Sequence, residues 1–95
     1  MAVEFTRVDG RDAGHVVLFA LSTCVWCRKT KRLLKELGVA YDYVDVDLLS
    51  REDRTRTDAQ VARHNPRRNY PTIVINDERC IAGYNEGQMK EAFGG

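Results

Sequence analysis

The chain has 95 residues, of which 43% are hydrophobic and 31% charged, a composition typical of one globular domain and too apolar for a disordered chain. Its 15 basic and 14 acidic residues leave a net charge of +1, so no field of one sign favours nucleic acid or an anionic membrane as a partner. The N-terminal residues mix charges of both signs, and the apolar run at residues 16–21 is far too short to span a bilayer, which argues against a signal peptide or membrane anchor. We therefore expect a monomeric cytoplasmic domain.

The first predicted strand covers residues 15–21, a β-branched and aromatic run that is apolar on both faces, as in a strand buried within a sheet. An amphipathic helix follows, for which Ser22 or Thr23 is expected to provide the N-cap and Gly38 the end. Residues 39–48 alternate apolar and polar side chains and predict a second strand. Strand, helix and strand with short links predict a right-handed parallel βαβ unit.

The second half of the chain predicts one helix, a hairpin and a last helix. Residues 50–64 are highly charged and predict a surface helix, which an Asn-Pro pair ends. Two apolar segments, 71–76 and 79–84, are separated by turn-forming residues and predict a β-hairpin. Asn85 is expected to cap the final helix. The predicted order is therefore β, α, β, α, β, β, α, an α/β fold.

Two cysteines with two residues between them, Cys24 and Cys27, lie at the start of the first predicted helix. This spacing occurs in metal sites, in disulfides of secreted domains and in dithiol redox pairs. An odd cysteine count in a cytosolic chain argues against a structural disulfide. As further zinc ligands the chain offers only Cys80, His15 and His64, which lack the paired spacing of zinc sites. The pattern favours a redox pair that needs no bound cofactor, with an iron-sulfur cluster or a zinc-binding domain as the alternative. We expect both histidines to be structural and Cys80 to act as a small hydrophobic residue.

The positions of the two cysteines predict different roles. At a helix start, unpaired N–H groups and the positive end of the dipole stabilise a thiolate, so Cys24 is expected to be the nucleophile. Cys27, one turn further on the same face, is within reach to attack the mixed disulfide that Cys24 forms. Pro71 opens a strand beside this site, and its bond to Tyr70 is a candidate for the cis isomer.

CVWC at residues 24–27, YPT at 70–72 and AGYNE at 82–86, in this order of elements, resemble the glutaredoxins, small oxidoreductases with the thioredoxin fold. The resemblance implies a four-stranded mixed sheet with helices on both faces, an N-terminal extension at 1–14 and a glutaredoxin-like domain at 15–95. It implies that Cys24 attacks, Cys27 resolves, and Pro71 is cis and packs against the pair. The chain is most similar to glutaredoxin-like proteins of anaerobes and archaea that carry LSTCxWC and NPxxxYPTIVI, whose thiol partner need not be glutathione.

The chain departs from the glutathione-using members at three places. Leu21 occupies the position at which those members share a basic residue. Residues 69–71 are NYP where those members have TVP, and residues 82–83 are AG where they have GG. Glu86 corresponds to the acidic residue that caps the γ-glutamyl group of glutathione. The expected partners are disulfide-containing proteins or small thiols, with a thiol or a thioredoxin-reductase-type protein as electron donor.

The expected substrate-binding residues lie near the cysteines, along the proline segment and before the last helix. Trp26 is expected to be a partly exposed ring that packs on the substrate, and Arg67 and Arg68 to hold a substrate carboxylate. The full set is Trp26, Arg67, Arg68, Tyr70, Thr72, Gly83, Tyr84, Asn85 and Glu86.

Overall fold

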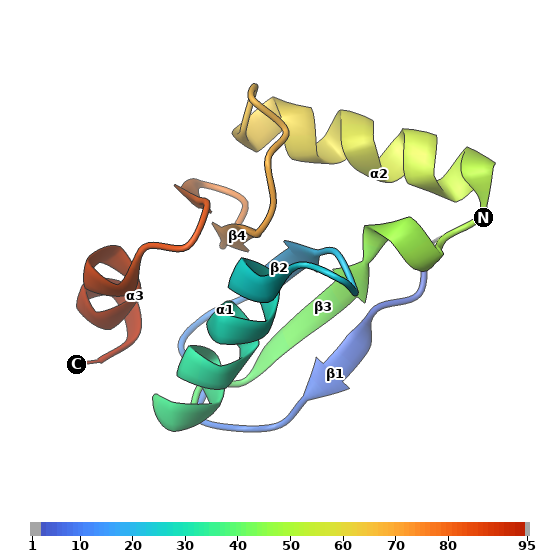
Figure 1. Cartoon of the computed structure of the whole chain (residues 1–95). Coiled ribbons are helices and arrows are strands. Elements are labelled where there is room, and N and C mark those ends of the chain that lie inside the picture. The colour runs from blue at the N-terminus through green and yellow to red at the C-terminus, as the bar shows by residue number, and fades with distance from the viewer. Residues whose placement is uncertain (1–2, 95) are drawn as a thin grey trace.

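A five-stranded mixed sheet lies at the centre of the computed structural model, which describes residues 3–94 (Figure 1). The elements in chain order are β1 (Thr6–Val8), β2 (Val16–Ala20), α1 (Val25–Glu36), β3 (Tyr41–Asp45), the 3₁₀ helix η1 (Val46–Leu48), α2 (Arg51–His64), β4 (Thr72–Ile75), β5 (Arg79–Ala82) and α3 (Glu86–Phe93). The strand order across the sheet is β1-β3-β2-β4-β5.

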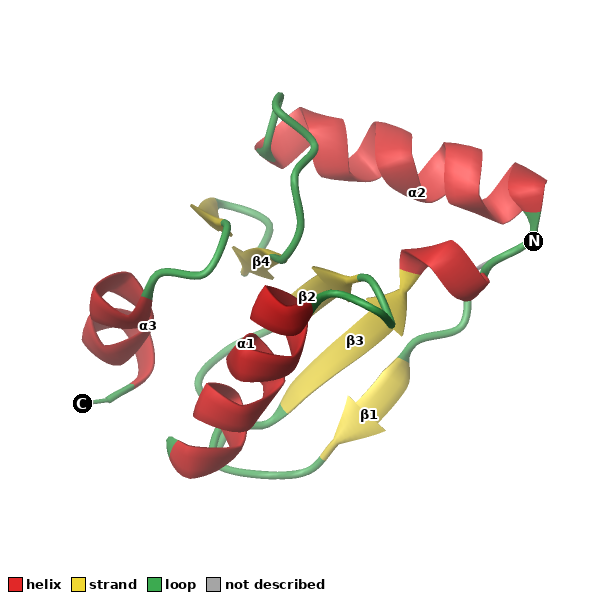
Figure 2. Ribbon diagram, in the orientation of Figure 1, coloured by secondary structure: helices red, strands yellow, loops and turns green. Residues whose placement is uncertain are grey.

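The inner strands form the predicted βαβ unit and hairpin. Strands β2 and β3 are parallel and joined by α1, whereas β4 pairs antiparallel with β2 and β5 antiparallel with β4. Asn76 and Asp77 turn the chain between β4 and β5 with positive φ angles of 53° and 58°, which Asn and Asp tolerate better than other residues. Figure 2 shows the loop after α2 running from that helix back to the sheet.

Helices cover both faces of the sheet, as predicted. On β2, Leu18 and Ala20 join a buried cluster with leucines of α1 and with Met89 and Phe93 of α3. Phe19, which points to the opposite face, joins a second cluster with Val61 of α2. This alternation follows from the period of two in a strand, so one continuous apolar run supplies both cores.

The fifth strand, β1, is a correction to the predicted four. It pairs antiparallel with β3, and the Arg7 guanidinium lies 3.5 Å from the Asp42 carboxylate across the two strands. Just before it, the ring of Phe5 packs edge-on against Phe19, with centroids 5.9 Å apart. A strand of three residues with Val8 as its one apolar side chain has too little periodicity for sequence detection, so only its pairing reveals it.

The start of α1 also differs from the prediction. The N-cap is Cys24 itself, whose Sγ accepts the N–H of Cys27, so the assignment of Ser22 or Thr23 as cap was wrong. Ser22 instead donates both its N–H and its hydroxyl to Asp47 in η1. Ser22 is not the cap because the Asp47 carboxylate binds both of its donor groups.

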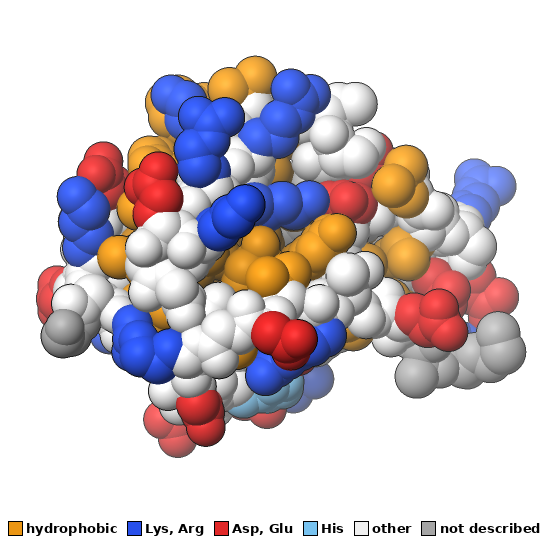
Figure 3. Space-filling view, turned by 90° about the horizontal axis from the view of Figure 1, so that it is seen from below, with side chains coloured by type: hydrophobic (Ala, Val, Ile, Leu, Met, Phe, Trp, Pro, Cys, Tyr) orange, Lys and Arg blue, Asp and Glu red, His pale blue; other side chains and the backbone are white. Residues whose placement is uncertain are grey.

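The surface carries charges of both signs. Figure 3 shows one face of the molecule, with hydrophobic side chains in its middle and Lys, Arg, Asp and Glu side chains around them. Within residues 3–94, none of the helices is long and apolar enough to cross a membrane.

Candidate active site

Cys24 and Cys27 lie where β2 ends and α1 begins, and both are free thiols. Cys24 is half-buried, whereas Cys27 is 0% exposed. The Cys27 N–H lies 3.3 Å from Cys24 Sγ, and the Cys24 N–H donates to the Leu21 carbonyl at 3.3 Å. The helix therefore directs an N–H group at the more exposed sulfur.

Cys27 lies in a different environment from Cys24. Burial, followed by the interaction with the Cys24 side chain, raises the pKa of the Cys27 thiol to about 12. The Leu21 N–H, which donates to Cys27 Sγ at 3.4 Å, and the charge of Lys31 act in the opposite direction. Lys31 is itself held by the Asp45 carboxylate at 3.0 Å. The two thiols thus differ in access, and burial disfavours ionisation of Cys27.

The proline loop, residues 65–71, lies beside the CxxC segment, because its Asn69 and Tyr70 line one cleft with Trp26. The Tyr70–Pro71 peptide bond is cis, as predicted. The Pro71 carbonyl accepts the Gly83 N–H at 2.7 Å, which joins the loop to the segment after β5. Tyr70 and Cys24 both pack against the buried cluster on the α1 face. The fold therefore brings three segments that are distant in the sequence to one place.

Asn65 organises the proline loop from inside. Its side chain is 3% exposed, and its Nδ2 donates to Thr72 Oγ1 at 2.9 Å and to Asn69 Oδ1 at 2.6 Å. Thr72 is fully buried and its hydroxyl donates to the Asn69 carbonyl. The Thr72 side chain thus supports the loop and does not face the surface as a substrate contact. Asn65 was recognised in the sequence only as a helix stop, and no local pattern identifies its second role.

Four of the predicted substrate-binding residues share one cleft. The aromatic cleft has a volume of about 250 Å³ and is lined by Trp26, Asn69, Tyr70, Gly83 and Tyr84. Trp26 is 53% exposed, so its ring is accessible as expected, and the ring lies 5.5 Å from that of Tyr84. Lys29 Nζ lies 4.6 Å from the Trp26 ring centroid on the neighbouring surface. The cleft offers flat aromatic surfaces next to the CxxC segment.

A second cleft adjoins the first and is rich in guanidinium groups. The arginine pocket has a volume of about 330 Å³ and is lined by Arg54, Asp58, Arg67, Arg68 and Tyr70. The Tyr70 hydroxyl donates to the Asp58 carboxylate at 2.6 Å, which ties the proline loop to α2. Burial and this hydrogen bond raise the pKa of Tyr70. Arg67 and Arg68 were predicted from the sequence, but Arg54 was missed. In the sequence Arg54 resembles the other charged residues of α2, and only the packing of that helix places it in the pocket.

Two predicted substrate-binding residues lie apart from the aromatic cleft. Asn85 caps α3, where its Oδ1 accepts the Gln88 N–H at 2.9 Å. Glu86 pairs with Lys90 at 2.8 Å, an interaction that lowers the pKa of Glu86. Glu86 lines a shallow depression together with Tyr84 and residues of α1. In the structure, Asn85 therefore caps α3 and Glu86 pairs with a lysine of the same helix.

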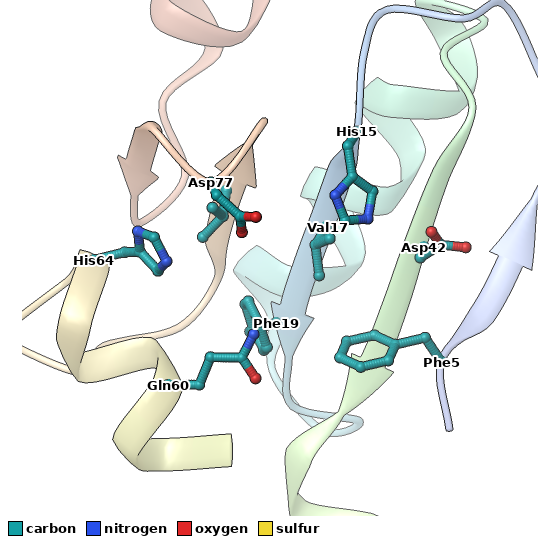
Figure 4. Close-up of a pocket in the computed structure, with 9 residues that line it drawn as sticks. Phe5, His15, Val17, Phe19, Asp42, Gln60, His64 and Asp77 are labelled. Atoms are coloured by element: carbon teal, nitrogen blue, oxygen red, sulfur yellow. The ribbon is translucent and has the colours of Figure 1, made fainter. Parts of the chain in front are cut away.

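A further pocket, on the α2 face of the sheet, includes none of the predicted catalytic or substrate-binding residues. It has a volume of about 280 Å³, and Figure 4 shows His15, Asp42 and Asp77 around an apolar floor. Its lining residues are Phe5, His15, Val17, Phe19, Asp42, Gln60, His64, Val74 and Asp77. Within residues 3–94, no group of three or more His, Cys, Asp or Glu side chains has the arrangement of a metal site. Cys80, on β5, is half-buried, and burial raises its pKa.

The fold and the cysteine pair have clear counterparts among known proteins. The family model described as Glutaredoxin matches residues 16–80. The chain belongs to the glutaredoxin family. None of the curated proteins compared with the chain matches it. Glutaredoxins are thiol-disulfide oxidoreductases, and with its Cys24–Cys27 pair this chain is one as well.

Among solved structures, the glutaredoxin chain is similar to three archaeal proteins. It is 50% identical to methanoredoxin of Methanosarcina acetivorans, with a TM-score of 0.87 and 90% of each chain covered. It is 45% identical to the glutaredoxin of Methanosarcina mazei Go1, with a TM-score of 0.89, 96% of this chain and 88% of that chain covered. A glutaredoxin of Archaeoglobus fulgidus is 32% identical, with a TM-score of 0.80 over 86% of this chain and 88% of that chain. These matches confirm the thioredoxin-like fold and the resemblance to archaeal glutaredoxins.

Proposed function

We propose that this glutaredoxin reduces disulfides by a dithiol mechanism in which Cys24 attacks and Cys27 resolves. The observation that carries the proposal is the contrast between the half-buried Cys24 and the fully buried Cys27, one helical turn apart. An incoming disulfide has access to the first sulfur but not to the second. The N–H of Cys27 supports the choice, because it donates a hydrogen bond to Cys24 Sγ at the start of α1.

The reaction transfers two electrons in two exchange steps. In the first, the Cys24 thiolate attacks one sulfur of a substrate disulfide, forms a mixed disulfide and releases one substrate thiolate. In the second, Cys27 gives up its proton to solvent and attacks Cys24 Sγ. The mixed disulfide breaks, the second substrate thiolate leaves, and a Cys24–Cys27 disulfide remains. The substrate has gained the two electrons that the protein has lost.

The substrates we propose are protein disulfides and small disulfides that carry an anionic group. An extended chain fits the aromatic cleft, where Trp26 supplies exposed apolar surface close to Cys24 in the chain. Val25, which follows Cys24 directly, is exposed as well. A carboxylate of the substrate fits the arginine pocket, which shares Tyr70 with the cleft. The shared side chain puts both recognition surfaces within reach of one ligand.

We propose a small thiol or a thioredoxin-reductase-type protein as the electron donor, in a cytoplasmic setting where free thiols stay reduced. Glutaredoxins act on thiol or disulfide substrates with glutathione or reductase donors, and a buckwheat glutaredoxin that is 25% identical to this chain has been solved as a glutathione complex. Here the apolar Leu21 stands where glutathione-using members resemble one another in a basic residue. Oxidised protein offered glutathione with its reductase, or thioredoxin reductase with NADPH, distinguishes the donors by which system re-reduces it.

The roles of the cysteines are tested by serine substitutions. We expect Cys24→Ser to abolish disulfide reduction, because Cys27 is inaccessible to substrate. Cys27→Ser should accumulate the mixed disulfide on Cys24, measured as a mass increase on the intact protein. Cys80→Ser is the matched control and should retain turnover. Substantial turnover by Cys24→Ser, or alkylation of Cys27 before Cys24 at neutral pH, would contradict the assignment.

A further inference from the structure

The turn after β3 holds the loop that leads into the cysteines. Asp47 accepts two hydrogen bonds from Ser22, one from its N–H at 2.8 Å and one from its hydroxyl at 2.5 Å. Ser22 follows Leu21 directly, and the Leu21 carbonyl accepts the N–H of Cys24. The two hydrogen bonds to one carboxylate therefore fix the backbone between β2 and α1.

The held backbone carries a group that acts on the buried thiol. The Leu21 N–H lies 3.4 Å from Cys27 Sγ and favours its ionised form, as does the charge of Lys31, whereas Cys24 opposes it. The surrounding cluster consists mostly of apolar side chains, among them Leu18, Ala20, Ile73 and Met89. The further titratable side chains in or against it are tyrosines, Tyr41, Tyr43, Tyr70 and Tyr84. The Leu21 N–H is thus the backbone donor to a sulfur that must lose its proton in the second step.

We propose that Asp47 is a positioning residue for the resolving step, which by holding Ser22 at two points keeps the Leu21 N–H on Cys27 Sγ and so enables Cys27 to attack the mixed disulfide. This inference rests on the proposed dithiol mechanism. The step it assists forms the Cys24–Cys27 bond, breaks the bond from Cys24 to the substrate sulfur and releases the substrate thiolate. Asp47 itself exchanges neither a proton nor electrons.

The other group that favours the Cys27 thiolate is held independently. Lys31 Nζ binds Asp45 at 3.0 Å and lies 4.2 Å from the ring centroid of Tyr43. Changes at Asp47 leave these contacts in place. The hydrogen bonds from Ser22 and, to a smaller extent, the charge of Arg54 of α2 lower the pKa of Asp47. The carboxylate is therefore ionised throughout the neutral range.

The charge of Asp47 and its hydrogen bonds have opposite effects on Cys27. A negative charge favours the neutral thiol, so removal of the charge alone speeds the resolving step or leaves it unchanged. Removal of the hydrogen bonds releases the Leu21 N–H and slows the step. Asp47→Asn removes the charge but keeps an oxygen to accept the Ser22 N–H, whereas Asp47→Ala removes both. The two variants therefore separate positioning from charge.

The test is a single turnover with 5,5′-dithiobis(2-nitrobenzoate) at limiting concentration, in a Cys80→Ser background. Attack by Cys24 releases one coloured thiolate and attack by Cys27 releases the second, so two phases report the two steps. We expect Asp47→Ala to slow the second release at pH 7 by about tenfold, the order expected for loss of one hydrogen bond to a charged group, and to move its pH profile upward. The first release is unchanged, and Asp47→Asn keeps the parent rate of the second.

Asp42→Ala is the matched control, because it removes an acid of β3 whose partner is Arg7 on the surface and leaves both phases unchanged. The inference is overturned if Asp47→Ala resolves at the parent rate and pH, if Asp47→Asn is slowed as much as Asp47→Ala, or if both phases slow together. Absence of a second release in the parent protein would instead contradict the dithiol mechanism, so the two failures are distinguishable.

Discussion

Cys24 and Cys27 carry the same side chain, yet their surroundings differ, and the proposed mechanism assigns them different roles. Cys24 is the N-cap of α1 and receives an N–H bond at its sulfur, which supports attack on a substrate. Cys27 is buried and its pKa is raised to about 12, which keeps it protonated until the mixed disulfide has formed. A resolving thiol that ionises easily would compete with the nucleophile for the incoming disulfide. The groups around Cys27 therefore affect the second step more than the first.

Arg67 offers a test of anion recognition. We expect Arg67→Ala to lower kcat/KM for dithiodipropionate, which carries two carboxylates, by about two- to fivefold, the size of an exposed ion pair. Reduction of the neutral bis(2-hydroxyethyl) disulfide should be unaffected. The measurement is steady-state kinetics with both substrates at low salt, where exposed charges are least screened.

The matched control for Arg67→Ala is Arg63→Ala, which removes the same charge from the exposed last turn of α2 outside the arginine pocket. Equal losses in the two variants would mean that the overall charge of the protein, and not the pocket, attracts the anion. Equal losses with the charged and neutral disulfides would likewise exclude a carboxylate site at Arg67.

At the scale of elements, helix α2 contributes to the site as well as to the core. Val61 joins the cluster on its face of the sheet, while Arg54 and Asp58 line the arginine pocket. The hydrogen bond from Tyr70 to Asp58 links this helix to the proline loop. A helix that is charged over most of its surface in the sequence thus has one face buried and another that faces the proposed substrate.

The segment that leads into β1 is expected to affect the stability of the protein but not its catalysis. Phe5, half-buried against Phe19, precedes the strand and packs on the α2 face. We expect Phe5→Ala to lower the free energy of unfolding by about 1 to 2 kcal/mol, less than for a fully buried ring, as measured by urea denaturation. Disulfide reduction at 25 °C should be unchanged, because Phe5 lies outside both clefts. Phe5→Leu keeps the apolar contact and should lose less. An unchanged midpoint for Phe5→Ala would show that the contact between Phe5 and Phe19 adds nothing to stability.

At the scale of the whole molecule, the buried thiol of Cys27 makes the stability of the reduced protein fall at alkaline pH. Folding raises the pKa of Cys27 from its ordinary value of 9.0 to about 12, so the unfolded chain loses this proton first as the pH rises. The contribution of Cys27 is fully present below about pH 9 and is lost as the pH rises through the folded value. Deprotonation therefore favours the unfolded state of the reduced protein.

We expect the free energy of unfolding of the reduced protein to fall more steeply above pH 9 than that of Cys27→Ala, by up to about 1.4 kcal/mol per pH unit. Urea denaturation under a reducing agent at several pH values gives both slopes. Tyr41, Tyr70 and Cys80 also have raised pKa values, but they are present in both proteins and cancel in the comparison. Parallel curves for the two proteins would contradict a buried, protonated Cys27.

The sequence by itself was sufficient for the order of the main elements, the parallel βαβ unit and the redox pair. These features depend on local periodicity, on turn residues and on a spacing of two between cysteines, all of which short stretches of chain contain. The cis bond before Pro71 was a candidate from the position of the proline at the start of a strand, and the resemblance to the glutaredoxins implied it. The strand β1 was missed because it has little periodicity of its own and forms by pairing with β3.

Only the tertiary structure decided which side chains meet. Ser22 binds Asp47 and does not cap α1 as predicted. Asn65 supports the proline loop, and Arg54 of α2 lines the arginine pocket. Each of these contacts depends on how distant elements pack, and a polar side chain looks the same in the sequence whether it faces water or a partner across the fold. The burial that distinguishes Cys27 from Cys24 has the same origin, since two cysteines three positions apart differ only in what the sheet and the helices place around them.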